Sequence, residues 1–164
     1  MSEIYSAEPR KWRILIATTV LIAASLALCW LAVDIYLTFG THPADGYQGE
    51  LAPWRDRALF SAILIVIALA ILTCTWLYLA AYIRKMVEHE DGAIEFHFFV
   101  PGTLQVSQED IYKTRHFDGE YNSASAPSVR APFTLVYVHQ RKLPLIFDPQ
   151  GQVLQPKVLR RYIS

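Results

Sequence analysis

Two long runs of uncharged, apolar residues dominate the first half of the chain. Ile14 to Val33 and Ala58 to Ile83 contain no charged residue over 20 and 26 positions. An α-helix rises about 1.5 Å per residue and the hydrocarbon core of a bilayer is about 30 Å thick, so each run is long enough to cross it. The pattern predicts transmembrane helices over 14–35 and 58–83, joined by an external loop over 36–57.

The second half of the chain alternates between apolar and polar residues, which is the pattern of β-strands. Five segments show it between turn residues: IEFHFFV, TLQVS, IYKTRHF, FTLVYVHQ and KLPLIFD. We expect one apolar face to be formed by Phe96, Phe98, Leu104, Val106, Leu135, Tyr137, Leu145 and Phe147. The last segment, VLQPKVLRRYI, has apolar residues at helical spacing and predicts a closing helix. Met86 to Glu90 is expected to extend the second long helix by a turn.

The order of these pieces resembles a known layout. DGAIEFHFFVPGTLQVSQEDI, APFTLVYVHQRKLPLIFD and the VLQPKVLRRYI helix are similar to the corresponding parts of bacterial membrane proteins with a PH-like domain directly after two spans. The resemblance covers 84–164 and implies a binding or assembly module, not a catalyst. The predicted fold is an α+β membrane protein, in which a two-helix transmembrane hairpin precedes a small β-rich, PH-like domain closed by a C-terminal helix.

Composition agrees with membrane residence and limits the possible partners. The chain is 53% hydrophobic and 18% charged, whereas about a quarter of the residues of a soluble protein are charged. The formal net charge is zero, so no overall positive field favours nucleic acid. Two cysteines are too few for a disulfide-rich scaffold.

The distribution of Lys and Arg predicts the orientation. Three lie in the segment 1–13, two in the loop 36–57, and ten after the second run. Because basic residues collect on the cytoplasmic side, we expect an N-terminal cytoplasmic tail over 1–13 and a cytoplasmic domain over 84–164. The expected location is the bacterial inner membrane, with both termini inside.

The strongest candidate for site chemistry is the pair His89 and His97, which lie among several acidic residues. A zinc site needs about four converging ligands, and no HExxH or cysteine pair accompanies these histidines. We interpret the stretch as the junction between helix and domain, and expect no metal, no cofactor and no enzymatic activity. No G-x-S-x-G, Walker or GxGxxG motif is present.

Two other segments are candidate binding sites. Arg84 and Lys85 follow the second run; one hypothesis is that they meet anionic lipid headgroups, and the other is that they only fix the topology, although both roles are compatible. The segment 118–130, DGEYNSASAPSVR, reads as a long loop, and loops of this length are usually functional or disordered. One hypothesis is that it docks on a neighbouring subunit through Asp118, Tyr121 and Arg130; the other is that it is a plain insertion.

These observations lead to three functional hypotheses. The first is a non-catalytic accessory subunit or assembly scaffold of a larger inner-membrane complex, whose partners are other membrane subunits, or further copies of itself bound through the spans. The second is a free-standing, membrane-tethered PH-like regulator that binds a peptide or lipid. The third is an enzyme accessory that holds a cofactor through its histidines.

Overall fold

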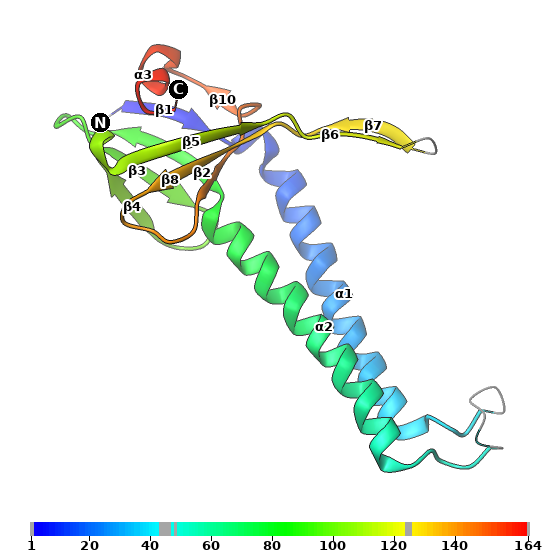
Figure 1. Cartoon of the computed structure of the whole chain (residues 1–164). Helices are drawn as coiled ribbons and strands as arrows, with labels where there is room; N and C mark the ends of the chain where they lie inside the picture. The colour runs from blue at the N-terminus through cyan, green and yellow to red at the C-terminus, as the bar shows by residue number, and fades with distance from the viewer. Residues whose placement is uncertain (1, 43–46, 48, 124–125, 164) are drawn as a thin grey trace. The chain divides into compact units, whose positions relative to one another are not determined.

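The computed structural model describes residues 2–42, 47, 49–123 and 126–163, with the backbone alone for 120–130. The chain divides into two compact units, one made of 1–13 with 77–164 and one made of 14–76. Two 28-residue helices, α1 (Lys11–Thr38) and α2 (Trp54–Ala81), account for most of the second unit (Figure 1). The two predicted apolar helices are therefore present, and the fold class is α+β. Part of the predicted external loop, residues 43–46 and 48, lies outside the described residues.

The first unit is built on a five-stranded antiparallel sheet in the order β10-β1-β2-β3-β4. Its members are β1 (Ser2–Ser6), β2 (Ile83–Glu88), β3 (Ile94–Phe98), β4 (Thr103–Val106) and β10 (Gln152–Val153). The N-terminal strand thus lies between β2, which follows it by about half the chain, and β10, which lies near the other end of the sequence (Figure 1). The prediction of a separate N-terminal tail over 1–13 was wrong.

Strand β1 is part of the core because two adjacent residues point inward. Ile4 and Tyr5 are both fully buried, and the register with β2 shifts between Glu3 and Tyr5. Such a bulge places neighbouring side chains on one face, which ordinary alternation does not allow. The backbone carbonyl of Ile4 also accepts hydrogen bonds from the amides of Leu154 and Gln155.

Strand β2 replaces the predicted extension of the second helix. Helix α2 ends at Ala81 and β2 begins at Ile83. Ile83 and Met86 are fully buried in the sheet, so this stretch gains more from facing the core of the domain than from continuing the helix. The turn that the Asp91–Gly92 pair predicts is present, with Gly92 at φ 80°.

A second, three-stranded sheet has the order β5-β8-β9 and comprises β5 (Ile111–Phe117), β8 (Phe133–Val138) and β9 (Leu145–Phe147). A short 3₁₀-helix, η3 (Gln108–Asp110), precedes β5. The core contains residues of both sheets: the ring centroids of Tyr5 and Phe147 lie 4.6 Å apart. Five of the eight predicted core residues are buried: Phe96, Phe98, Val106, Leu145 and Phe147.

In strand β8 the residues that face the core are the alternate ones, not those that were predicted. Thr134, Val136 and Val138 are buried, while Leu135 and Tyr137 are half-buried. Because FTLVYV is apolar at nearly every position, its alternation does not define which face is inward. Leu104 of β4 is also only half-buried.

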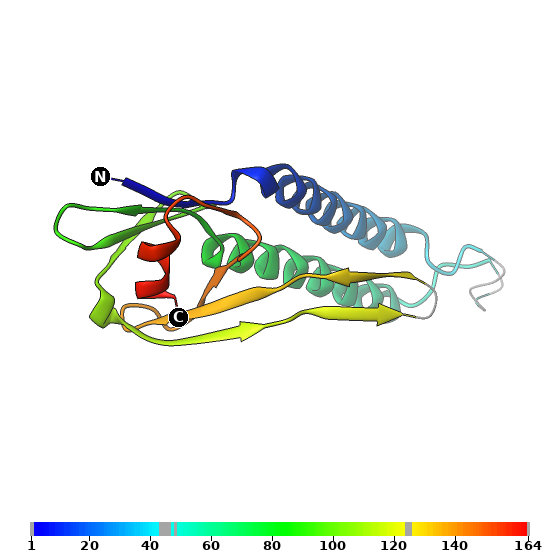
Figure 2. The ribbon, with the colours of Figure 1, turned by 90° about the horizontal axis from the view of Figure 1, so that it is seen from above.

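The predicted loop over 118–130 was wrong as well, since a β-hairpin occupies it. Strands β6 (Glu120–Ser123) and β7 (Ala126–Arg130) pair antiparallel. They continue the ladder of β5 and β8 through the hydrogen bond from the Ala131 amide to the Gly119 carbonyl. Figure 2 shows the resulting long, two-stranded ribbon.

The C-terminal helix predicted from VLQPKVLRRYI is confirmed as α3 (Pro156–Tyr162). Pro156 occupies its first turn, where the missing amide hydrogen costs no helical hydrogen bond. Leu159 and Tyr162 are buried, and the Tyr162 hydroxyl donates to the carbonyl of Gly92 at 2.6 Å. The last helix therefore fixes the turn between β2 and β3.

The second unit is a hairpin of α1 and α2 that packs through small side chains. Apart from Ile14 near the start of α1, the buried positions of the two helices recur every seven residues: Ser25 and Ala32 on α1, with Ser61, Ala68 and Thr75 on α2. A seven-residue spacing keeps one seam of each helix facing the other, and the Ser61 hydroxyl donates across it to the carbonyl of Ala32 at 2.8 Å. Large apolar side chains lie outside this seam.

The position of β1 predicts which fragment folds alone. A protein in which a Gly/Ser linker replaces residues 14–76 keeps β1 and should fold, whereas the fragment 83–164 should not. The fragment loses the burial of Ile4 and Tyr5, about 1.5–3 kcal/mol for each large side chain, out of a total of about 5–15 kcal/mol. Circular dichroism and chemical denaturation would compare the two proteins. Equal stability would show that β1 is dispensable.

Candidate functional site

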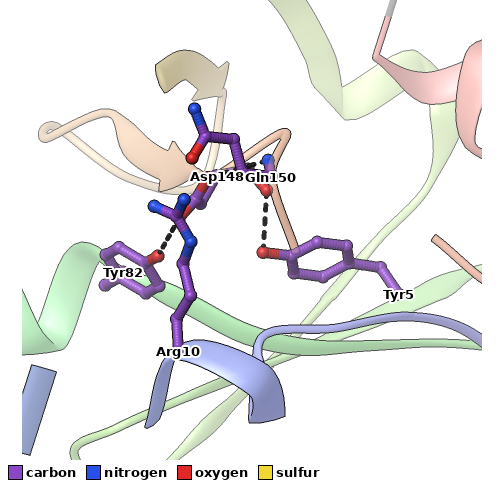
Figure 3. Close-up of polar contacts among 5 residues, drawn as sticks. All are labelled: Tyr5, Arg10, Tyr82, Asp148 and Gln150. Atoms are coloured by element: carbon purple, nitrogen blue, oxygen red, sulfur yellow. Dashed lines mark hydrogen bonds and ion pairs between the residues drawn. The ribbon is translucent and has the colours of Figure 1, made fainter. Parts of the chain in front are cut away.

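Side chains from distant parts of the sequence lie around one buried carboxylate (Figure 3). Asp148 is 6% exposed, and its Oδ2 accepts hydrogen bonds from the Tyr82 hydroxyl at 2.9 Å and from Arg10 Nη1 at 3.0 Å. Its Oδ1 accepts from the backbone amide of Gln150 at 2.8 Å. The backbone carbonyl of Asp148 accepts from the Tyr5 hydroxyl at 2.9 Å. We call these four side chains, Tyr5, Arg10, Tyr82 and Asp148, the Asp148 cluster.

The members of the Asp148 cluster come from elements that lead into and out of the long helices. Arg10 closes the 3₁₀-helix η1 (Glu8–Arg10), which runs directly into α1. Tyr82 is the residue after α2, and Asp148 follows β9. A buried carboxylate is stable only when charge and hydrogen bonds replace water, and here Arg10 supplies the charge. Arg10, directly before α1, and Tyr82, directly after α2, therefore bind the same carboxylate oxygen.

The tyrosines of the cluster act as donors. Burial, together with the negative charge of Asp148, raises the pKa of Tyr5. The protonated hydroxyl donates to the Asp148 carbonyl. A second contact secures the end of α2, since Arg141 Nη1 donates to the carbonyl of Ala80 at 3.0 Å, one of the helix-terminal carbonyls without a helical partner.

Arg84 and Lys85, the predicted headgroup ligands, face acidic residues of the N-terminal segment. Arg84 Nη2 lies 2.8 Å from Glu8 Oε1, and Lys85 Nζ lies 3.0 Å from Glu3 Oε2. These pairs are partly exposed, and such pairs contribute at most about 1 kcal/mol each. They nevertheless offset the positive charge on which headgroup binding by these two residues would depend.

The predicted partner-binding residues fall on the β6–β7 hairpin and its base. Asp118 is exposed between β5 and β6. Tyr121 pairs with Val129, and Arg130 pairs with Glu120, in the backbone ladder. The side chains of Tyr121 and Arg130 lie outside the described residues, so their proposed contacts remain a prediction.

His89 and His97 both approach the same carboxylate on β3. His89 Nε2 lies 2.9 Å from Glu95 Oε2, and His97 Nε2 lies 3.8 Å from Glu95 Oε1. The hydrogen bond from His89 is the main cause of a lowered pKa for Glu95. In the described part of the chain, no three His, Cys, Asp or Glu side chains form a group that could hold a metal ion.

A surface that the sequence analysis did not single out lies on the side of β5 and β8 opposite the core. Because Thr134, Val136 and Val138 point inward, the alternate residues of β8 and their partners on β5 point outward. The outer β5–β8 face comprises Tyr112, Lys113, Arg115, Phe117, Phe133 and Tyr137. Its signal in the sequence is IYKTRHF, in which basic and aromatic residues are interleaved.

Its side chains contact one another in an ordered array. The rings of Phe117 and Phe133 stack at 5.0 Å, and Lys113 Nζ lies 5.9 Å from the centroid of the Tyr137 ring. Tyr112 lies beside Tyr137 and is 55% exposed.

Comparisons with known proteins identify no relative. No protein-family model, no curated protein and no solved structure matches this chain.

Replacement of Asp148 by Asn tests the Asp148 cluster. Asn has nearly the same size, but it leaves the Arg10 guanidinium without a counter-charge, and breaking a buried ion pair costs about 3–5 kcal/mol. Since the Arg10 side chain is 27% exposed, we expect a loss near the lower end of that range. Asp118→Asn, at an exposed position, is the control and should change the free energy of unfolding by less than about 0.5 kcal/mol. A similarly small loss for Asp148→Asn would contradict the structural role of the cluster.

The lowered pKa of Glu95 predicts a pH effect of known sign. Stabilisation from the ionised carboxylate is present above the ordinary pKa of a glutamate and is lost as the pH falls through the lower, folded value. Carbon-13 NMR titration of the linker-joined domain should show a depressed midpoint for Glu95. His89→Ala should raise that midpoint toward the ordinary value, and His97→Ala should change it less because of the longer distance. An unchanged midpoint in His89→Ala would contradict this assignment.

Proposed function

We propose that the chain is a non-catalytic accessory subunit or assembly scaffold, anchored in the bacterial inner membrane by α1 and α2. The observation that carries the proposal is the exposure of large apolar side chains along both helices, among them Trp30, Leu26, Val66 and Leu69. Only 11% of the most apolar stretch of the first helix is buried, and only 17% of that of the second. A core helix of a soluble protein is mostly buried, so we expect lipid or other apolar helices to cover these surfaces.

The length and packing of the helices support the same proposal. Twenty-eight residues give a helix of about 42 Å, which exceeds the hydrocarbon thickness even when tilted. The hairpin seam uses Ser, Ala and Thr side chains, as helix pairs in membranes often do. Lipid or neighbouring subunits would then cover the larger side chains.

The role of scaffold rests on how the domain is attached. A single residue separates α2 from β2, and four residues separate β1 from α1. These short connections leave no long linker between the β-domain and the two helices. A domain joined this closely to a membrane anchor suits a protein that presents a binding surface beside the membrane, and the counts of Lys and Arg favour the cytoplasmic side.

A second candidate is a free-standing, membrane-tethered regulator with a PH-like domain that binds a peptide or lipid. Two antiparallel sheets followed by a C-terminal helix support this alternative. Gentle detergent extraction followed by native mass measurement distinguishes the two: the scaffold should leave the membrane in one large, stable complex, and the regulator as a monomer or homodimer.

Reporter fusions test the topology. A fusion after His42 should report the periplasm and a fusion at the C-terminus should report the cytoplasm, because the basic residues favour the inner side. Activity of a periplasmic reporter at the C-terminus would show that the orientation is the opposite of the predicted one. Extraction of the chain by alkaline carbonate, which leaves integral proteins in the membrane, would contradict membrane anchoring itself.

A further inference from the structure

We propose that the outer β5–β8 face binds anionic phospholipid headgroups at the surface of the membrane in which the helices are anchored. The inference rests on the proposed function, since it requires α1 and α2 to span that membrane. It assigns the lipid contact to residues other than Arg84 and Lys85, whose charges are offset by Glu8 and Glu3.

The first argument is charge. Lys113 and Arg115 are exposed on this face. No acidic residue occurs in 111–117 or in 133–138. The face is therefore positive in a chain whose net charge is zero, and an anionic surface is the complementary partner.

The second argument is the chemistry of the neighbouring rings. Tyr112 is 55% exposed and Phe117 is 40% exposed, and they flank the two basic residues on β5. Aromatic rings are enriched at the headgroup level of membranes, because an apolar body and a polarisable or polar edge suit that region. Basic side chains alone would fit any anion, but basic residues interleaved with exposed rings fit an interface that is both charged and apolar.

The third argument is proximity. Only one residue separates α2 from β2, and one residue spans at most about 3.6 Å, so the domain begins directly where α2 ends. Attraction to anionic lipid acts over about one Debye length, roughly 10 Å at 0.1 M salt. An acidic protein partner would have to be recruited from solution, whereas the lipid is already present.

A simpler explanation covers part of these observations. Strand β5 lies at the edge of its sheet, and charged residues on edge strands prevent aggregation. That role explains Lys113 and Arg115 but gives no reason for the exposed Tyr112 and Phe117 beside them.

The experiment uses the full chain in nanodiscs of phosphatidylcholine, with or without phosphatidylglycerol. In a background of Cys29→Ser and Cys74→Ser, an environment-sensitive dye is attached to Leu135→Cys on the outward side of β8, or to Leu154→Cys as the control probe. Brominated lipids quench fluorophores that reach the bilayer. The four tryptophans, which all lie in α1 and α2, report helix insertion in the same samples.

We expect the dye at 135 to be quenched in discs with phosphatidylglycerol and the dye at 154 to be quenched much less. Lys113→Gln with Arg115→Gln should reduce the equilibrium constant for binding of this face to the anionic bilayer by roughly 25-fold, about fivefold for each basic side chain. Lys157→Gln with Arg160→Gln, two exposed positions on α3, is the matched control and should leave the quenching unchanged.

The other outcomes overturn the inference in distinguishable ways. Quenched tryptophans with an unquenched dye at 135 would keep the anchor and show that another occupant, such as an acidic protein, uses this face. Equal quenching without phosphatidylglycerol, or in the Lys113/Arg115 variant, would exclude headgroup charge as the cause. Unquenched tryptophans would overturn membrane anchoring, and the lipid contact with it.

Discussion

A single buried carboxylate holds together the parts of the chain that the two long helices separate. Asp148 accepts hydrogen bonds from Arg10 and Tyr82, and its backbone accepts from Tyr5. Water cannot solvate a carboxylate in this position, so removal of its partners would leave an uncompensated charge in the domain. The arrangement connects β1, the residues next to the ends of both helices and the turn after β9.

This topology predicts that the sheet closes late in folding. Strand β1 pairs with β2 and β10, so its partners appear in the chain only after both helices. Contacts between such distant segments are slow to form, because the intervening chain has to be closed into a loop first. Pairing of α1 with α2 shortens that loop, and the helical hairpin thus prepares the closure of the sheet.

Much of the fold could be predicted from periodicity, and the exceptions have physical reasons. The apolar runs, the strands β3, β4, β5, β8 and β9 and the closing helix each show a pattern long enough to predict the element. Strand β1 does not: it has five residues, a bulge puts Ile4 and Tyr5 on the same face, and its partners are remote in sequence. The inward face of β8 could not be chosen because FTLVYV is apolar on both sides. The hairpin over 120–130 was missed because small polar residues there resemble a loop.

The sites were less predictable than the fold. Nothing local marks Asp148, since its partners come from positions 5, 10 and 82. Arg84 and Lys85 were predicted to contact lipid headgroups without their acidic partners Glu3 and Glu8, because the fold of the N-terminal segment was not recognised. The interleaved residues of IYKTRHF were visible, and only the register with β8 shows that they form one face with Phe133 and Tyr137.

The central claim is that the N-terminal strand is an integral part of the β-domain. Native-state hydrogen exchange of the full chain measures this directly, because amides that open only by global unfolding share one free energy of opening. We predict that the amides of β1 that bond to β2 exchange with the same opening free energy as those between β2 and β3. Exchange of β1 at the rate of an unstructured tail, while β3 stays protected, would contradict the account.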